Sequence, residues 1–396
     1  EGRIKGETGR TTGQLRLFAT LAEEGSWSQA RIDTAQPDRA PLPKPDIRSL
    51  LRPIGPVAVF AASNFPLAFS TAGGDTASAL AAGCPVIVKA HSSHPGTAEL
   101  IARAIRKAAQ TTGMPEGVFS LLFGSGRTVG SALVTHPAIK AVGFTGSTAG
   151  GTALMELASK RPEPIPVYAE MGSVNPVVLL PQAVSENPTA IAAGLHLSAT
   201  LGVGQFCTNP AIVLIKKDAD GDTLVAAFVE KMKDTTAQVM LNPTIQRAYN
   251  DGLERMQTNN RVATLVAPPQ AIDNAACLGG AAVFEASATS FLEDKSLSHE
   301  IFGPGTTLIR WQSKDELIAL LESFEGQLTG TIHATDTDLY SYPEVLPILE
   351  RKVGRIVYNG FPTGVEVCHS MVHGGPYPAT SDGRGTSVGT HAITRF

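Results

Sequence analysis

The sequence has few cysteines, and none of them belongs to a recognisable metal-binding or disulfide pattern. Its 396 residues include four cysteines, which lie far apart at Cys84, Cys207, Cys277 and Cys368. No Cys-x-x-Cys pair or Cys/His metal spacing is present, and the pattern therefore disfavours a disulfide framework and a structural zinc site. This use of cysteine is typical of a reducing compartment, and it predicts a cytoplasmic protein without a bound metal.

Long apolar runs and an excess of positive charge are also lacking. No uninterrupted apolar stretch reaches the roughly 20 residues that a membrane helix needs, and residues 1–9 are polar rather than signal-like. The 36 acidic residues outnumber the 32 lysines and arginines, which gives a formal net charge of −4. Because this balance provides no basic field for nucleic acid or anionic lipid, the composition favours a small molecule as the partner.

What the sequence does contain is enough apolar residues for a sizeable interior. With 43% hydrophobic and 17% charged residues over 396 positions, it predicts a globular enzyme of two domains. An amphipathic helix capped by Thr11 or Thr12 is predicted near the N-terminus. Six prolines between residues 36 and 56 indicate an extended, exposed arm that could pair with another subunit.

Alternating strands and helices follow the arm. Apolar runs predict strands at 57–60, 86–88, 118–122 and 141–144, with helices at 74–83, 96–112 and after 128. This β-α-β rhythm predicts a doubly wound, parallel, open sheet. It restarts with strands at 176–180 and 211–215, separated by one long Ala-rich helix that ends near residue 200. Residues 374–396 are predicted to be rich in loops.

One cysteine stands in a connection where its sulfur could face a cleft. Cys207 follows a predicted helix and precedes a predicted strand, with Gly204 three residues before it. Such a placement suits a reactive thiolate, although a cysteine taken alone is more often a packing residue. Upstream, Glu170 ends a short strand-like run and supplies a carboxylate that could act as a base.

Several separated motifs resemble those of the aldehyde dehydrogenase superfamily in order and approximate spacing. They are Ser63-Asn64-Phe65-Pro66, Val88-Lys89, Phe144-Thr145-Gly146-Ser147, Glu170-Met171-Gly172-Ser173, Gly204-Gln205-Phe206-Cys207 and Glu300-Ile301-Phe302-Gly303-Pro304. Each motif alone is weak evidence, whereas the ordered set is strong. The resemblance implies an α/β fold with an open Rossmann-type cofactor domain, an α/β catalytic domain and an extended oligomerisation arm.

The resemblance also implies oxidation of an aldehyde to a carboxylic acid on Cys207. The side-chain amide of Asn64 and the backbone N–H of Cys207 would stabilise the negative oxygen formed when the thiolate attacks the carbonyl. Glu170 would deprotonate the water that hydrolyses the thioester. Relatives that transfer the acyl group to coenzyme A generally lack this base, so its presence favours release of the free acid. The ordinary alternatives are a turn asparagine and a salt-bridged glutamate.

A nicotinamide dinucleotide is the cofactor that the resemblance implies. Gly146 and Ser147, between a strand and a helix, would offer donors to its pyrophosphate, and Lys89 could reach the adenosine ribose or its phosphate. NAD-preferring relatives usually carry an acidic residue three positions after this lysine. Ser92 stands there instead, which favours NADP over NAD, with His91 as a further phosphate contact. The nicotinamide ribose and ring would be held by Glu300 and Phe302.

Longer sequence segments around Asn64 and in residues 359–378 resemble those of the branch of the family that oxidises 2-oxoglutarate semialdehyde to 2-oxoglutarate. This substrate carries a carboxylate, for which the candidate partners are Thr363, Ser381, Arg384 and the nearby histidines. The other predicted substrate contacts are Phe65, Phe206 and Thr208. A different semialdehyde or an aliphatic aldehyde is an open alternative.

Other classes of function were weighed against this one. A cysteine hydrolase needs a histidine partner for the thiol, and no histidine lies in a matching motif. An inactive scaffold that keeps the fold is disfavoured by the intact catalytic motifs. His369 and His373 are spaced as metal ligands on a helix would be, but flanking Pro and Gly and the lack of a third ligand disfavour a metal site.

The predicted organisation has two domains. A dinucleotide-binding domain covers 1–172, interrupted by the arm at about 30–52, and a catalytic domain covers 173–385, with the active site between them. Residues 386–396 are a return segment. Both ends look truncated compared with the family, and a homodimer or homotetramer is expected.

Overall fold

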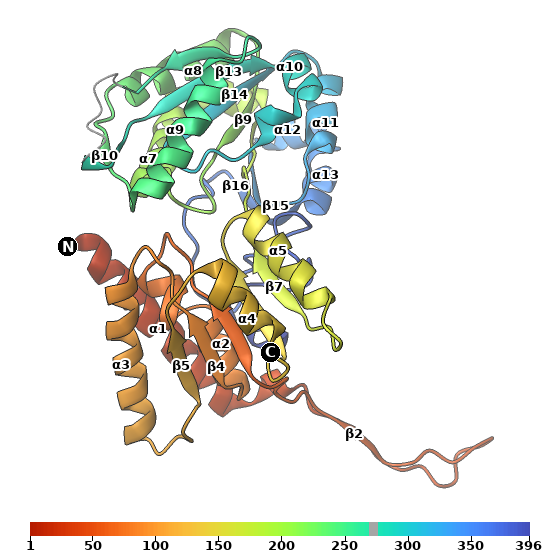
Figure 1. Cartoon of the computed structure of the whole chain (residues 1–396). Helices are drawn as coiled ribbons and strands as arrows, with labels where there is room; N and C mark the ends of the chain where they lie inside the picture. Colours follow the sequence, from red (N-terminus) through yellow and green to blue (C-terminus); the bar gives the residue numbers. More distant parts are fainter. Residues whose placement is uncertain (269–275) are drawn as a thin grey trace. The chain divides into compact units, whose positions relative to one another are not determined.

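The computed structural model describes residues 1–268 and 276–396. These residues form two compact units (Figure 1). Unit 1 contains Glu1–Ala169, Glu366–Met371 and Gly385–Phe396, and unit 2 contains Glu170–Val365 and Val372–Arg384. The first unit is therefore discontinuous, because it takes up two segments from the C-terminal part of the chain.

Unit 1 is built on a five-stranded sheet with the order β5-β4-β3-β6-β7. The strands are β3 (Val57–Phe60), β4 (Val86–Lys89), β5 (Phe119–Leu122), β6 (Ala141–Thr145) and β7 (Val167–Glu170). β3 pairs in parallel with both β4 and β6, and β4 pairs in parallel with β5. Because the chain order reverses at β3, the sheet is doubly wound, and the carboxyl ends of β3, β4 and β6 share one edge.

Helices cover both faces of this sheet. They are α1 (Gly2–Glu24), α2 (Asp75–Ala82), α3 (Pro95–Thr111), α4 (Ser131–Thr135) and α5 (Thr148–Ser159). Val57 and Val59 pack on one face with side chains of α1, α2 and α3, and Ala58 and Phe60 pack on the other face with those of α4 and α5. This alternation along β3 is that of a strand buried on both sides.

Helix α1 begins at Gly2, ten residues earlier than a cap at Thr11 would allow, and the predicted cap is therefore wrong. The Thr11 hydroxyl donates to the carbonyl of Glu7 inside the helix. The polar residues Glu7 and Gln14 are buried because they find partners in residues 67–74: the Glu7 carboxylate accepts from the backbone N–H of Leu67, and the Gln14 amide donates to the carbonyl of Ala68. The sequence pattern does not predict the burial of Glu7 and Gln14, because their partners lie far along the chain.

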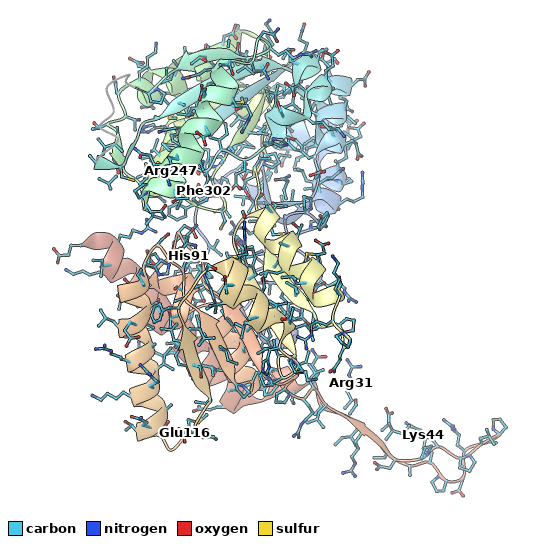
Figure 2. The ribbon with its side chains drawn as sticks, viewed as in Figure 1. Arg31, Lys44, His91, Glu116, Arg247 and Phe302 are labelled. Atoms are coloured by element: carbon cyan, nitrogen blue, oxygen red, sulfur yellow. The ribbon has the colours of Figure 1, made fainter. Side chains whose placement is uncertain are left out.

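The proline-rich segment forms an extended hairpin (Figure 1). Strands β1 (Arg31–Asp33) and β2 (Ile47–Ser49) pair antiparallel, and every residue in them is exposed. Figure 2 labels Arg31 and Lys44 on this hairpin, and the Lys44 ammonium lies 2.6 Å from the Asp33 carboxylate. The extended and exposed arm that the prolines predict is thus present in the chain.

In the described part of unit 2, seven strands form one sheet with the order β11-β13-β14-β9-β8-β15-β16. The strands are β8 (Val177–Leu179), β9 (Ile212–Lys216), β11 (Ala263–Val266), β13 (Ala282–Ser287), β14 (Gly305–Trp311), β15 (Gln327–His333) and β16 (Val353–Tyr358). Neighbouring strands are parallel except at the β11/β13 edge. A separate antiparallel pair is formed by β10 (Gln238–Val239) and β12 (Leu278–Gly279).

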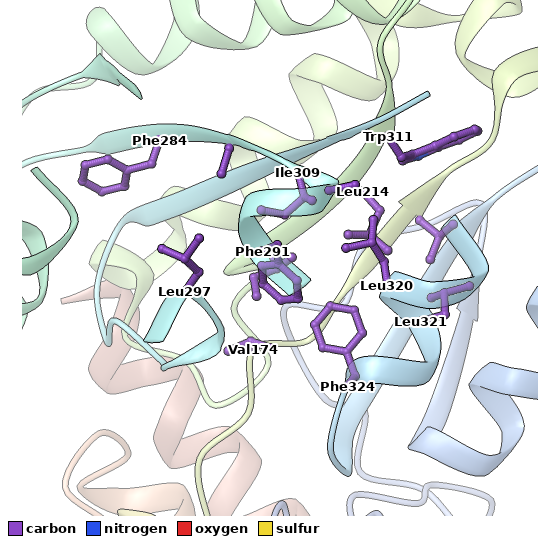
Figure 3. Packing of buried hydrophobic residues seen from close by; sticks show 14 of the residues in the cluster. Val174, Leu214, Phe284, Phe291, Leu297, Ile309, Trp311, Leu320, Leu321 and Phe324 are labelled. Atoms are coloured by element: carbon purple, nitrogen blue, oxygen red, sulfur yellow. The ribbon is translucent and has the colours of Figure 1, made fainter. Parts of the chain in front are cut away.

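The core of unit 2 also lies on both faces of its sheet. Helices α6 (Pro181–Glu186), α7 (Pro188–Thr200) and α8 (Ala219–Lys233) pack on the face of Val213 and Ile215. The opposite face, with Leu214 and Ile309, packs against α9 (Pro243–Gln257), α10 (Ala288–Glu293), α11 (Lys314–Ser323) and α13 (Val345–Lys352) (Figure 3). Such two-sided burial requires the continuous apolar strands seen in the sequence.

The prediction of a single helix ending near residue 200 is wrong in one respect, because the segment forms two helices, α6 and α7. Pro188 takes the first turn of α7, and Asn187 between α6 and α7 has φ −143°. Proline tolerates a first helical turn, but it disfavours a helical conformation in the residue before it. Other elements of the described chain include α12 (Asp336–Ser341) and a short 3₁₀ turn, Thr390–Arg395, in the loop-rich C-terminal segment. Among the described helices, none is both long and apolar enough to cross a membrane.

Candidate active site

Cys207 lies in a tight connection between α7 and β9 of unit 2. Gly202, Val203 and Gly204 before it all have left-handed backbone conformations. Gly204 has φ +62°, and a Cβ atom there would lie 2.3 Å from the backbone of Gly303. Only glycine meets both conditions without strain. The nucleophile connection and the Glu300–Pro304 motif therefore pack directly against each other within this unit.

A buried amide holds the backbone of Cys207 in place. The side-chain Nδ2 of Asn175 donates to the carbonyl of Cys207 at 2.8 Å and to that of Asn209 at 2.9 Å. Its Oδ1 atom accepts from the Thr329 hydroxyl at 3.0 Å, and Asn175 is fully buried with φ +47°. Two backbone acceptors beside the cysteine are thereby satisfied, which limits the movement of the connection.

The thiol of Cys207 contacts an imidazole that also contacts a carboxylate. His373 Nε2 lies 3.2 Å from Cys207 Sγ and 2.9 Å from Glu170 Oε1. His373 and Glu170 are 2% and 5% exposed, whereas Cys207 is only partly buried. A sulfur open to solvent and backed by a buried pair of proton-accepting groups is the arrangement expected of an activated nucleophile.

Backbone pairing brings the histidine and the glutamate together. Glu170 ends β7 and forms a β-bridge with Thr380, and the N–H of the next residue, Met171, donates to the carbonyl of Ala379. These contacts tie the segment 372–380, which carries His373, to the strand end that carries Glu170. Both of these contacts are made by the same nitrogen, Nε2, so this one atom links the sulfur to the carboxylate.

His373 is the functional residue that sequence reasoning missed. The sequence analysis found no histidine to partner Cys207, and the structure corrects this, because His373 lies 166 positions away in the chain and contacts the thiol. The absence of a partner is therefore no argument against a cysteine hydrolase. In the sequence, His373 has the spacing from His369 of a metal pair, and it is also among the histidines considered as partners of the substrate carboxylate. His369 instead lies 3.2 Å from the Thr390 hydroxyl through Nδ1.

The same three side chains are also a candidate set of metal ligands. One ligand atom from each of Glu170, Cys207 and His373 lies within 4.8 Å of the others. Thiolate, imidazole and carboxylate are the ligands that zinc prefers. The sequence analysis predicted no metal site and did not foresee this cluster.

The predicted phosphate contacts lie at the carboxyl end of β4 in unit 1. Lys89 is buried, and desolvation lowers the pKa of its ammonium. Desolvation, together with the charges of His94 and Lys89, lowers the pKa of His91 to about 4. The N–H of Ser93 donates to His91 Nδ1 at 3.1 Å, which leaves the proton of the neutral ring on Nε2. Ser92 is exposed, and Figure 2 labels His91.

Gly146 and Ser147 occupy the neighbouring turn between β6 and α5. Both are exposed, and Ser147 is the N-cap of α5, accepting from the N–H of Gly150 at 3.2 Å. The first turn of this 12-residue helix directs backbone N–H groups toward the sheet edge. A pyrophosphate is favoured at such a helix end because the N–H groups and the helix dipole both attract negative charge.

Asn64 and Phe65 follow β3 at the same sheet edge of unit 1. Both are buried, and the carbonyl of Asn64 accepts from the guanidinium of Arg3. Phe65 packs edge-on against Phe69, with ring centroids 5.6 Å apart, and Arg10 lies over both rings. The turn that carries the predicted oxyanion donor is thus held by α1.

Glu300 and Phe302 lie in the loop between the 3₁₀ turn Lys295–Ser298 and β14. Desolvation raises the pKa of Glu300 to about 7, and the backbone N–H of Ser173 partly opposes this rise. The side chain is nevertheless accessible to solvent. The carboxyl group is therefore crowded by protein without being sealed from water. Phe302, labelled in Figure 2, is partly exposed.

Of the predicted substrate residues in unit 2, three belong to the cysteine connection or contact it. Phe206 and Thr208 flank Cys207. The Thr363 hydroxyl donates to the carbonyl of Ser198 at 2.9 Å, and the N–H of Gly364 donates to the Thr208 hydroxyl at 3.3 Å. These bonds attach residues 362–364 to the nucleophile connection.

The other two predicted substrate residues of unit 2 lie outside this set of contacts. Ser381 is partly buried, and the Arg384 side chain is 98% exposed, 3.9 Å from Asp382. The contacts described here bring neither of them to Cys207.

A Rossmann-type sheet, an α/β unit with an accessible cysteine, and a carboxylate that reaches this cysteine through histidine define a class of enzyme. Residues 2–394 match the model of the aldehyde dehydrogenase family, and the chain belongs to this family. Its class is that of oxidoreductases acting on aldehydes.

Two curated relatives match the whole chain. It is 54% identical to alpha-ketoglutaric semialdehyde dehydrogenase 2 of Azospirillum brasilense over 394 residues, which are 100% of this chain and 75% of the relative. It is 49% identical to the alpha-ketoglutaric semialdehyde dehydrogenase of Acinetobacter baylyi, over 100% of this chain and 74% of the relative. The chain thus spans about three quarters of the length of these two relatives.

Solved structures share the fold at lower identity. Glyceraldehyde-3-phosphate dehydrogenase of Methanocaldococcus jannaschii, crystallised with NADP, is 22% identical, with a TM-score of 0.80 over 98% of this chain and 78% of that one. Methylmalonate-semialdehyde dehydrogenase of Oceanimonas doudoroffii is 19% identical, with a TM-score of 0.81 over 100% of this chain and 77% of that one. The fold of the chain, including both of its sheets, is therefore shared with these two solved structures.

Proposed function

We propose that this protein oxidises 2-oxoglutarate semialdehyde to 2-oxoglutarate with a nicotinamide dinucleotide, NADP in preference to NAD, and that Cys207 is the nucleophile. The observation that carries the proposal is the contact of His373 Nε2 with both Cys207 Sγ and Glu170 Oε1. The names of the two whole-chain relatives support the choice of substrate.

The first step is removal of the thiol proton. His373 Nε2 accepts this proton at 3.2 Å, and the Glu170 carboxylate at 2.9 Å stabilises the resulting imidazolium. An imidazolium next to a thiolate favours the charged form of both groups. Cys207 Sγ then bonds to the aldehyde carbon, and the carbonyl oxygen becomes negative.

The negative oxygen needs hydrogen-bond donors. The side-chain amide of Asn64 and the backbone N–H of Cys207 fill this role in the proposal. The amide of Asn175 helps indirectly, because it fixes the backbone of Cys207 from the carbonyl side. A bound nicotinamide dinucleotide, whose ribose and ring Glu300 and Phe302 would hold, would supply the oxidant that converts the adduct on Cys207 to a thioester.

Water then cleaves the thioester. Glu170 is buried and lies within hydrogen-bonding distance of His373. Its carboxylate takes the proton of the attacking water, because the imidazole already holds the thiol proton. That proton returns from His373 Nε2 to Sγ when the thioester is cleaved. The bond between carbon and Sγ breaks, the carboxylic acid leaves, and Cys207 is regenerated.

NADP fits the polar groups at the carboxyl edge of the unit 1 sheet. The desolvated Lys89 ammonium would gain an anionic partner in the 2′-phosphate, and the neutral His91 would donate from Nε2. Ser92 adds no negative charge that would repel the phosphate. The first turn of α5, capped by Ser147, would hold the pyrophosphate, and Glu300 and Phe302 the nicotinamide ribose and ring.

The protein is also proposed to act as a cytoplasmic homodimer or homotetramer. The exposed hairpin β1–β2 supports this assembly, because its strands present unpaired backbone groups and exposed apolar side chains such as Ile32 and Ile47.

A panel assay tests the function. NADPH and NADH formation are measured with 2-oxoglutarate semialdehyde, succinate semialdehyde and hexanal, with Cys207→Ala as the inactive control. We expect the highest kcat/KM with 2-oxoglutarate semialdehyde and NADP, and no turnover by Cys207→Ala, which should still bind nucleotide. Glu170→Gln should retain a burst of one NADPH per site followed by slow turnover, because acylation precedes its step. Preference for another aldehyde, or turnover without Cys207, would refute the proposal.

A further inference from the structure

We propose that Arg355 of β16 is the residue that selects a carboxylate-bearing aldehyde, by binding the carboxylate at the far end of the substrate while Cys207 holds the aldehyde carbon. The inference rests on the proposed function and names a specificity residue that the sequence analysis did not consider. Its basis is the position of this one guanidinium relative to the nucleophile connection.

Strand register places Arg355 on the face of the sheet that leads to Cys207. In the parallel pair β15/β16, Arg355 lies opposite Thr329. Neighbouring residues in such a pair project from the same face of the sheet. The Thr329 hydroxyl points to Asn175, and Asn175 in turn binds the carbonyl of Cys207. The side chain of Arg355 therefore leaves the strand toward the connection that carries the sulfur.

A second chain of contacts reaches the same place from the other side. Arg355 Nη2 donates to the carbonyls of Pro362 and Gly364, at 3.1 and 3.2 Å. The N–H of Gly364 donates to the hydroxyl of Thr208, the residue after the nucleophile. The guanidinium thus braces the loop that closes against the nucleophile connection, and one hydrogen-bonded residue separates it from Thr208.

Electrostatics agree with this geometry. The side chain of Arg355 is partly buried, and desolvation lowers its pKa, whereas the charge of the Cys207 thiolate raises it. The cation and the sulfur are therefore close enough to influence each other. Holding a guanidinium partly out of water costs free energy, which a bound carboxylate offsets.

The chemistry of arginine suits this task. A guanidinium has five N–H donors in a planar fork, so it can hold loop carbonyls and a carboxylate at the same time. In 2-oxoglutarate semialdehyde the carboxylate is four carbon–carbon bonds from the aldehyde carbon. By contrast, the predicted carboxylate partner Arg384 is 98% exposed and has no described contact that leads to Cys207.

The kinetic test compares a charged and a neutral aldehyde of equal chain length, 2-oxoglutarate semialdehyde and pentanal, in the wild type, Arg355→Met and Arg355→Lys. Arg351→Met is the matched control, because Arg351 lies on neighbouring α13, is exposed and pairs with Glu322. Loss of a charge-assisted hydrogen bond should reduce kcat/KM of Arg355→Met for the semialdehyde by about 100-fold, mainly through KM, with pentanal little affected. Arg355→Lys should be intermediate, and Arg351→Met should match the wild type.

A second measurement needs no turnover. Iodoacetate and iodoacetamide both alkylate Cys207, but only iodoacetate carries a charge. The ratio of their alkylation rates therefore cancels any change in the thiolate itself. We expect Arg355→Met to lower the iodoacetate to iodoacetamide ratio, and Arg351→Met to leave it unchanged. If both aldehydes lose the same factor, or if the alkylation ratio does not change, Arg355 supports the loop and does not bind the carboxylate. A wild type that oxidises no aldehyde refutes the proposed function instead, and the alkylation ratio still decides the role of Arg355.

Discussion

At the scale of single residues, the reactivity of Cys207 depends on one nitrogen atom. His373 Nε2 is within hydrogen-bonding distance of both the sulfur and the Glu170 carboxylate, and both His373 and Glu170 are buried. A buried carboxylate stabilises a neighbouring imidazolium, and the imidazolium stabilises the thiolate. The three groups should therefore act together in activating the sulfur.

Replacement of His373 by glutamine should slow the alkylation of Cys207 by iodoacetamide at pH 7 and reduce kcat. We expect a loss of about 100-fold in both, because a positioned base contributes this much to proton transfer. The alkylation rate of the variant should keep rising at higher pH, where the wild-type rate has levelled off. His369→Gln is the control, since that ring contacts Thr390. An unchanged pH profile of alkylation in His373→Gln would remove the histidine from thiol activation.

At the scale of elements, the site depends on a connection that has little regular structure. Between the end of α7 and the start of β9, the chain passes through three left-handed residues. The last of them, Gly204, packs against the backbone of Gly303. The motif of the nucleophile and the motif of Glu300 are therefore positioned together. A change in one of them must displace the other.

The substitution Gly204→Ala should destabilise the protein. Its Cβ atom would meet the backbone of Gly303, and an alanine at φ +62° is strained. We expect a loss of about 2–4 kcal/mol in the free energy of unfolding, measured by urea denaturation. Gly9→Ala is the matched control: this residue lies in α1 with nothing within 4 Å of the added Cβ. It should be neutral or slightly stabilising. Equal stabilities of the two variants would contradict the packing argument.

At the scale of the whole molecule, the strands of the hairpin β1–β2 bury none of their residues within the chain. All six strand residues are exposed, and Leu42 between the strands is 70% exposed. Apolar side chains and strand edges left open to water favour association with another protein chain. We therefore propose that the hairpin mediates assembly and does not stabilise a single chain.

Charged substitutions in the hairpin test this role. Leu42→Asp combined with Ile47→Asp should lower the molar mass measured by light scattering from that of an oligomer toward that of one chain, because it places charge in the contact. The melting temperature of the isolated chain should change little. Leu100→Asp, at a residue of α3 that is 67% exposed, is the control and should keep the mass of the wild type. A monomeric wild type, or an unchanged mass in the double variant, would show that the hairpin does not mediate assembly.

Local sequence patterns predicted much of the fold and part of the candidate site. The apolar runs at 57–60, 86–88 and 141–144 predicted strands that the structure contains, because a strand buried on both faces needs such a run whatever surrounds it. The same reasoning failed for Thr11, whose burial depends on partners far along the chain, and for the helix interrupted at Pro188, which apolar content alone did not divide.

The sequence by itself determined the nucleophile motif, its order relative to the Glu170 and Glu300 motifs, and the rhythm of two α/β units, because these features are contiguous and their physical requirements are local. Only the tertiary structure decided which imidazole contacts the sulfur of Cys207 and which guanidinium binds the adjoining loop. His373 and Arg355 lie 166 and 148 positions from the cysteine, and no local pattern links either of them to it. They approach it through β-bridge pairing at Thr380 and through the register of β15 with β16, and such long-range pairings leave no mark in neighbouring residues.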